Sequence, residues 1–212
     1  MNKVKLVVAA LIVAALSMEI HAQVGKSLGV VDVNTVAEKE LATFPNMTPA
    51  IAKALVAKRP FVSVTDLNTF LLGQGLTQAQ ANEIYGKAFV HINLNTAAAA
   101  EILLVPNAGK KMAHEFDEYR PWRSYAQFAK EIGKYVGADA TAKLAQYTFI
   151  PINANTASDE ILMTIPGANA ALVATIKAGR PYKDAAALEA ALAKGSAPAE
   201  AKRVGRYLVI QP

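Results

Sequence analysis

The amino-acid sequence predicts an all-α protein made of three tandem units of about 60 residues, preceded by a signal peptide. Three sets of markers, each recurring at spacings of 60 or 61 residues, carry this prediction. The markers are an Asn-Thr pair, a proline, and an Arg-Pro pair followed by an aromatic residue: Asn34-Thr35, Asn95-Thr96 and Asn155-Thr156; Pro45, Pro106 and Pro166; Arg59-Pro60-Phe61, Arg120-Pro121-Trp122 and Arg180-Pro181-Tyr182. Because all three markers keep one register, we interpret them as an internal repeat.

The first 22 residues are predicted to be a secretory signal peptide that is cleaved after Ala22. Lys3 and Lys5 precede an unbroken apolar run of 11 residues, Leu6–Leu16. An uncleaved membrane anchor is the alternative, but a membrane-spanning helix needs about 20 apolar residues. We therefore expect a periplasmic or secreted protein without a membrane span after cleavage, in which residues 23–29 form a short linker.

The composition narrows the classes of site that the chain can carry. The sequence has no cysteine, which excludes disulfides, thiol catalysis and thiolate metal sites. Without residues 1–22, the 22 basic residues become 20 and the 17 acidic residues become 16, so the net charge is +4. This balance is mildly basic, whereas strong nucleic-acid binders concentrate basic residues on one face.

The units are expected at residues 30–91, 92–150 and 151–212, and each begins with a helix, a tight hairpin and a second helix. The Asn-Thr pair is expected to provide the N-cap of the first helix, and Thr35 with Glu38 fits a capping box. The marker proline is expected to stop this helix, because proline lacks an N–H group and disfavours helical geometry in the preceding residue.

The Arg-Pro pair is expected to end the second helix of each unit, and two further helices are expected after it. Ser63, Ser124 and Asp184 are expected to cap the third helix, and Ser124 with Gln127 fits a capping box. The fourth helix is expected over 77–87, 139–146 and 198–207. Apolar residues at helical spacing predict the core, at Leu41, Phe44, Ile51, Leu55, Leu67 and Leu71 in the first unit, at Ile102, Val105, Met112, Phe116, Phe128 and Ile132 in the second, and at Leu162, Ile165, Leu172, Ile176, Leu188 and Leu192 in the third.

The ends of the units are short β-branched segments around Val90, Ile150 and Ile210, and the sequence leaves open whether they pair as strands. Linkers between the units are almost absent. Units of this size are marginal alone and gain stability by stacking on their neighbours. We therefore expect a semi-rigid rod or arc.

Within this pattern, Asn95-Thr96-Ala97, Val105-Pro106, Arg120 and the segment 122–128 resemble the helix-hairpin-helix domain of the competence DNA-uptake receptor (ComEA-like) family. The resemblance covers nearly all of the chain after the signal peptide, three times over. It implies an exported protein that binds double-stranded DNA without sequence preference. In that family a Gly-x-Gly hairpin brings backbone N–H groups and a helix N-terminus close to a phosphate.

The hairpins of this chain depart from the Gly-x-Gly pattern. The first hairpin, 45–49, has no glycine, and its last residue, Pro49, lacks an N–H group. Asn46, Asn107 and Asn169 are expected to preserve the left-handed turn, which asparagine tolerates. The candidate DNA-binding residues are those of the second and third hairpins, Asn107, Ala108, Gly109, Lys110, Lys111, Gly167, Ala168 and Asn169.

Lys110 and Lys111 are the sharpest local feature, because they fall at a helix start, where the helix dipole disfavours cations. A bound anion would relieve this conflict, and two solvated lysines are the alternative. The cluster Lys202, Arg203 and Arg206 is either a solvated face or a polyanion patch. The repeated arginines at 59, 120 and 180 are expected to be structural, complementing a helix dipole and stacking beside the aromatic residue.

The leading hypothesis is an exported helix-hairpin-helix protein that binds double-stranded DNA weakly, through hairpin backbone and lysine contacts to phosphate, with a role in DNA uptake. The alternative is a periplasmic structural or protein-interaction scaffold whose hairpins have lost DNA binding. No catalytic site, metal site or cofactor is expected, since His114-Glu115 lacks the second histidine of a zinc-protease helix and no catalytic triad or phosphate loop is recognisable.

Overall fold

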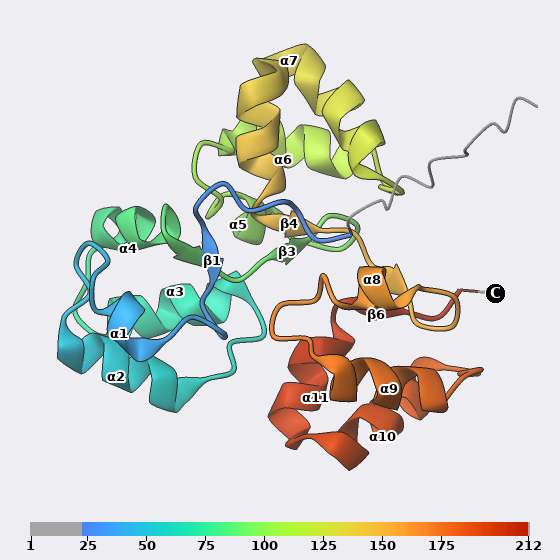
Figure 1. The fold of residues 1–212 in the computed structure, drawn as a ribbon. Helices are drawn as coiled ribbons and strands as arrows, with labels where there is room; N and C mark the ends of the chain where they lie inside the picture. Colours follow the sequence, from blue (N-terminus) through green and yellow to red (C-terminus); the bar gives the residue numbers. More distant parts are fainter. Residues whose placement is uncertain (1–22, 212) are drawn as a thin grey trace, which may run out of the picture.

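The computed structural model describes residues 23–211, so the predicted signal peptide lies outside the described residues. The described chain is mainly helical, with eleven helices and six strands of two residues each (Figure 1). Between residues 23 and 211, no helix is both long and apolar enough to cross a membrane.

The short strands answer the question that the sequence left open, because they form three separate parallel pairs. Each pair joins the beginning and the end of one segment of the chain. The helices of that segment come between the two strands in the sequence. The pairs are β1 (Val31–Asp32) with β2 (Ala88–Phe89), β3 (Ile92–Asn93) with β4 (Thr148–Phe149), and β5 (Ile152–Asn153) with β6 (Leu208–Val209). We refer to residues 31–89, 92–149 and 152–209 as units 1, 2 and 3.

The helices follow one another in the same order in each unit. Unit 1 contains α1 (Glu38–Leu41), α2 (Pro49–Lys58), α3 (Val64–Gly73) and α4 (Gln78–Tyr85). Unit 2 contains α5 (Ala99–Ile102), α6 (Gly109–Glu118) and α7 (Tyr125–Ala145), and unit 3 contains α8 (Asp159–Leu162), α9 (Ala170–Ala178), α10 (Ala185–Gly195) and α11 (Pro198–Gly205). Helix α7 is interrupted at Gly137, with φ 78° and ψ 169°, so it corresponds to the third and fourth helices of the other units.

The caps of the third helices agree with the sequence, whereas those of the first helices do not. Ser63, Ser124 and Asp184 each accept a hydrogen bond from a helix N–H group, as expected. The N-caps of α1, α5 and α8 are instead Ala37, Ala98 and Ser158. Those three helices also end four residues before the marker proline, so the proline is not their direct stop signal.

The repeated asparagine, which was expected to cap the first helix, pairs with backbone after the Arg-Pro bond. In unit 2, Asn95 Oδ1 accepts from Trp122 N at 2.6 Å and Asn95 Nδ2 donates to Trp122 O at 3.0 Å. Asn34 and Asn155 make the same two bonds to Phe61 and Tyr182. The side-chain amide of asparagine has both a donor and an acceptor, so it can pair with the N–H and the C=O group of one aromatic residue outside the helices.

The repeated arginines are structural, as expected, but by a different contact. Arg120 donates from Nε to Leu94 O at 2.8 Å and from Nη2 to Ala97 O at 2.6 Å, and Arg180 makes the equivalent pair. The expected stacking on the aromatic residue does not occur within 23–211, where the cation–π contacts belong to other residues. Phe61, Trp122 and Tyr182 are buried, as expected for core residues.

The three units gather around a common centre instead of forming the expected rod or arc (Figure 1). Units 1 and 2 share one hydrophobic core, and a second core is formed by unit 3 together with Val24 and Phe149. Aromatic contacts join neighbouring units, with ring centroids 5.0 Å apart for Phe89 and Tyr147 and 4.4 Å apart for Phe149 and Tyr207. Units 1 and 3 also meet, because Tyr207 donates from its hydroxyl to Asp32 Oδ2 at 3.4 Å.

Asp32 is a buried charge at this centre, with His91 Nδ1 3.2 Å from its Oδ2 atom. Burial alone would raise the pKa of Asp32, but the hydrogen bond and charge of His91 hold it below its usual value. The equivalent residue of unit 2, Asn93, accepts from Asn95 N at 2.9 Å, just as Asp32 accepts from Asn34 N at 2.8 Å. The turn therefore needs the side-chain oxygen but not the charge.

We expect Asp32→Asn to preserve the fold and to weaken the acid dependence of stability. The lowered pKa means that ionised Asp32 stabilises the native state at neutral pH, and that this contribution is lost as the pH falls through about 4 and below. Urea unfolding between pH 3 and 7 measures this, and the variant should be less stable near pH 7 with a flatter profile below about pH 5. Parallel profiles for the two proteins would contradict the assignment.

Residues 23–29, expected to be a linker, pack against unit 2. Ile150 N donates to Gln23 O at 2.7 Å and Gly25 N donates to Thr148 O at 3.0 Å, so the segment lies along the outer edge of β4. Leu28 N adds a bond to Gln146 Oε1 at 3.0 Å. A Cβ atom at Gly25 would lie 1.8 Å from Ala145 O, so only glycine fits there.

Gly25→Ala should therefore detach this segment from β4. We expect a loss of about 2 kcal/mol in the free energy of unfolding, from two to three hydrogen bonds. Faster hydrogen exchange at Ile150 N would report the detachment directly. Lys26→Ala, at an exposed neighbour, is the matched control, and unchanged exchange in Gly25→Ala would mean that the segment tolerates a side chain.

Candidate nucleic-acid interface

The hairpin of unit 2 connects α5 to α6 and has two residues with positive φ. Asn107 has φ 65° and Gly109 has φ 62°, so both positions of the expected Gly-x-Gly pattern keep its backbone geometry. Val105 and Ala108 are buried and joined by a bond from Ala108 N to Val105 O at 3.0 Å. The hairpin is thus anchored on the core side, while Asn107 and Gly109 are exposed.

The N-terminus of α6 is open. No side chain caps it, unlike α2 and α9. The first N–H groups of a helix have no partner within the helix, and the helix dipole makes this end attractive to anions. Lys110 and Lys111 are exposed at the same end. Ten-residue α6 therefore presents free amide groups and two ammonium groups together.

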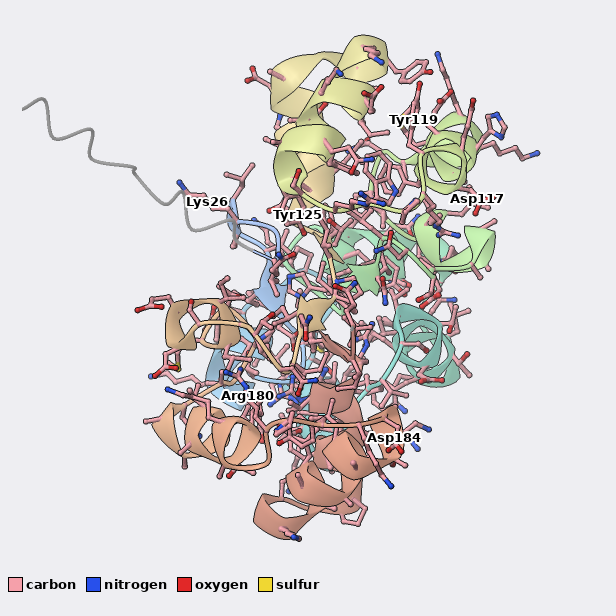
Figure 2. All side chains as sticks on the ribbon, turned by 90° about the vertical axis from the view of Figure 1, so that its right-hand side faces the viewer. Lys26, Asp117, Tyr119, Tyr125, Arg180 and Asp184 are labelled. Carbon is pink, nitrogen blue, oxygen red and sulfur yellow. The ribbon has the colours of Figure 1, made fainter. Side chains whose placement is uncertain are left out.

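Two tyrosine side chains of unit 2 lie along α6, from Lys111 in its first turn to its C-cap, Tyr119. Lys111 Nζ lies 4.7 Å from the centre of the Tyr135 ring. Tyr119 and Tyr135 are 3.0 Å apart at their hydroxyl groups, and the hydrogen bonds of Tyr135 to Tyr119 and Glu115 raise its pKa. Figure 2 shows Tyr119 with Asp117 on the outer side of unit 2. Tyr135 stays neutral and adds an exposed aromatic surface next to Lys111.

The acidic residues of α6 are mostly paired or buried. Asp117 Oδ1 lies 2.6 Å from Arg120 Nη1, and Glu118 Oε2 lies 3.2 Å from His114 Nε2. Glu115 is buried, with an exposed fraction of 6%. These three carboxylates lie in the second half of α6, away from its N-terminus.

The hairpin of unit 1 is closed to an anion. Asn46 has φ 59°, so it holds the left-handed turn as expected. Thr48 caps α2 by accepting from Ile51 N, and Pro49 removes a further N–H group. Asn46 Nδ2 also donates to Glu83 Oε2 at 2.8 Å, which brings a carboxylate to the hairpin.

The hairpin of unit 3 is also closed, and it corrects one expectation. The left-handed residue is Gly167, with φ 78°, and not Asn169, which has φ −145°. Asn169 instead caps α9, accepting from Leu172 N at 2.9 Å. Glycine at 167 leaves asparagine at 169 free to act as a cap. Ala168 is half-buried, and a Cβ atom at Gly167 would lie 3.1 Å from Thr35 Cγ2 in unit 1.

One position of the fourth helix distinguishes the hairpins, and its contact with the hairpin was not predicted from the sequence. Five residues before the closing strand stand Glu83, Lys143 and Arg203. Glu83 contacts the first hairpin, and Arg203 donates to Pro166 O in the third at 2.8 Å while pairing with Glu200 at 2.6 Å. The equivalent Lys143 is exposed. The spacing of 60 residues between Glu83, Lys143 and Arg203 is the sequence feature that marks them as equivalent.

In the described part of the chain, no group of three or more His, Cys, Asp or Glu side chains is placed so that it could hold a metal ion. Comparison with protein-family models, curated proteins and solved structures gave no match to this chain. The hairpin geometry and the motif resemblance are therefore the basis for inferring function.

Proposed function

We propose that this protein is an exported, tandem helix-hairpin-helix protein that binds the phosphates of double-stranded DNA weakly and without sequence preference. The threefold recurrence of the Asn–aromatic contact and of the contact from arginine Nη2 to a backbone carbonyl supports the tandem arrangement. The positive residues Lys3 and Lys5 before an apolar run support export to the periplasm or beyond. DNA uptake is the process that the motif resemblance suggests.

The open N-terminus of α6 is the observation that carries this proposal. Of the three hairpins, the second combines free amide groups, positive φ at both turn positions and exposed lysines. Thr48 and Asn169 occupy the equivalent amide groups of units 1 and 3. Unit 2 therefore binds DNA in this proposal. Units 1 and 3 pack against unit 2 and have no open hairpin of their own.

The chemistry of this hairpin explains both weak affinity and lack of sequence preference. Backbone N–H groups and lysine ammonium groups contact phosphates, which position a protein on DNA but carry no sequence information. Lys110 and Lys111 supply two cations at the helix start, and exposed Lys143, at the position from which Glu83 and Arg203 reach the other two hairpins, supplies a third. The contact therefore covers few phosphates. No bond is made or broken in this role, and we propose a binding protein rather than an enzyme.

A titration of fluorescein-labelled duplex DNA, followed by anisotropy over a range of salt concentrations, tests the proposal. Three neutralised phosphates predict a log–log slope of about −2.7, at roughly 0.9 for each phosphate. Duplexes of different sequence should bind equally. Absence of binding at low salt would overturn the proposal.

A protein-interaction scaffold is the second candidate function. Closure of two of the three hairpins by their own side chains favours it, because the fold is kept where a phosphate site is not. Helical repeat arrays provide broad surfaces for protein partners. Under this alternative, the chain co-purifies from the periplasm with a stoichiometric protein partner, and nuclease treatment does not release that partner.

A further inference from the structure

The outer edge of the closing strand in unit 2 is fully covered. Thr148 O accepts from Gly25 N at 3.0 Å and from the Tyr125 hydroxyl at 2.7 Å. Ile150 N donates to Gln23 O at 2.7 Å, and Val24 forms an antiparallel bridge with Phe149. Gly25 and Tyr125 thus share Thr148 O as acceptor, and Figure 2 labels the neighbour Lys26 and Tyr125, which lies at the start of α7.

In unit 3, neither an N-terminal segment nor a tyrosine from the third helix covers the closing strand β6. The strand registers make Leu208 and Val209 the equivalents of Thr148 and Phe149. Ala185, the first residue of α10 after its cap, is the equivalent of Tyr125 in α7. Two large aromatic side chains of unit 2 are thus replaced by alanine and valine in unit 3.

A groove of about 640 Å³ lies where these side chains are missing, between α10, α11 and β6. Its apolar lining comes from Ala185, Leu188, Ala201, Gly205, Leu208, Val209 and Ile210, and the charged residues Lys183, Asp184, Glu189, Lys202 and Arg206 also line it. No group within residues 23–211 forms a hydrogen bond with Leu208 O or Ile210 N, which are the equivalents of Thr148 O and Ile150 N. An unpaired strand edge of this kind is a template for another extended segment.

Unit 1 has no comparable groove. Ala88, Phe89 and Val90 are completely buried, and the Tyr147 ring from unit 2 packs against Phe89. The open edge is therefore particular to unit 3 among the three closing strands.

We propose that this groove binds an extended segment of a partner protein, which adds antiparallel to β6. The segment carries a phenylalanine or tyrosine that fills the space left by Ala185 and Val209, followed by glycine. The order is that of Val24 and Gly25 on β4, with a larger first residue because Val209 is smaller than Phe149, the residue opposite Val24. Glycine follows because Gly25 passes Ala145 O too closely for a side chain, and Gly205 is the equivalent of Ala145. Backbone hydrogen bonds give affinity in such strand addition, and the side-chain pocket gives specificity.

A peptide derived from the protein's own segment tests the proposal. The probe is the acetylated and amidated heptapeptide Gln-Phe-Gly-Lys-Ser-Leu-Gly, which is the segment 23–29 with phenylalanine at the place of Val24. Titrated into the full chain labelled with ¹⁵N, it should shift amide signals of α10, α11 and β6, with the largest shift at Ile210. The peptide with valine at the second position should bind more weakly.

Ala185→Tyr fills the groove and should weaken binding of the phenylalanine peptide by at least about tenfold. The variant should fold, because Ala185 is exposed and unit 2 accommodates tyrosine at the same position. Ala193→Tyr, at another exposed alanine of α10 outside the groove, should bind as the parent does.

Three outcomes of the peptide titrations would overturn the proposal. They are no binding at millimolar peptide, equal binding by Ala185→Tyr and the parent, and shifts confined to β4, which would mean that the peptide only displaces residues 23–29. Self-association in sedimentation that Ala185→Tyr abolishes would identify a second copy of this chain as the occupant, contrary to the proposed partner.

Discussion

Trp122→Ala should reduce the free energy of unfolding by about 3–5 kcal/mol, the range for removal of a large buried aromatic side chain. Trp122 is 1% exposed, its ring centroid lies 5.2 Å from that of Phe128, and its Nε1 atom donates to Phe116 O at 2.8 Å. The loss is large because the cavity opens at the centre of unit 2. Urea unfolding followed by circular dichroism measures it.

Trp122→Phe is the matched control, because unit 1 has phenylalanine at the equivalent position, 61. It should cost roughly 1–2 kcal/mol, from one lost hydrogen bond and a smaller ring. Since units 1 and 2 share a core, Trp122→Ala should also lower the protection of unit 1 amides against hydrogen exchange, while unit 3 retains most of its own. Equal costs for both variants would show that the side chain is not packed as described.

Lys110→Glu/Lys111→Glu should weaken binding to duplex DNA by at least about tenfold at low salt, which corresponds to about 1.4 kcal/mol or more. Both lysines are exposed at the open start of α6, where carboxylates would repel phosphate. The remaining binding should also depend less steeply on salt, because fewer phosphates are neutralised. The anisotropy titration of the parent protein provides the comparison.

Lys53→Glu/Lys194→Glu is the control for net charge, since it reverses two exposed lysines in units 1 and 3. A contact at the second hairpin requires this variant to keep most of the affinity and the salt slope of the parent. If the two double variants lose affinity equally, DNA responds only to the overall charge of the protein.

Apolar residues at helical spacing, placed in one register by the repeat markers, allowed the main helices and the core to be predicted. The predicted core leucines, such as Leu41 and Leu162, are buried. The bridging role of Asn95 was not predictable in the same way. Asparagine before a helix fits a cap equally well, and its actual partner, Trp122, is brought close only by the tertiary fold.

The strands and the closed arrangement depended on contacts that are distant in the sequence. A strand of two residues has no recognisable periodicity, and β1 pairs with residues 57 positions away. The contact between Asp32 and Tyr207 spans 175 positions. No local pattern indicates such contacts, so the sequence alone favoured an extended rod.

The candidate site was partly predictable. The positions 107–111 were identified because the hairpin is local, and backbone angles support both Asn107 and Gly109 as turn residues. The closing of the third hairpin was missed because asparagine fits both a left-handed turn and a helix cap, and Asn169 takes the second role. The hairpin contacts of Glu83 and Arg203 were missed because both residues belong to a helix that comes later in the chain.

Amide chemical shifts of the ¹⁵N-labelled protein, recorded while a short DNA duplex is added at low salt, test the central claim most directly. The open α6 terminus predicts that the largest shifts fall at Gly109, Lys110 and Lys111, with little change at the capped starts of α2 and α9. Shifts of equal size at all three hairpins, or none at Gly109, would contradict a phosphate site formed by unit 2.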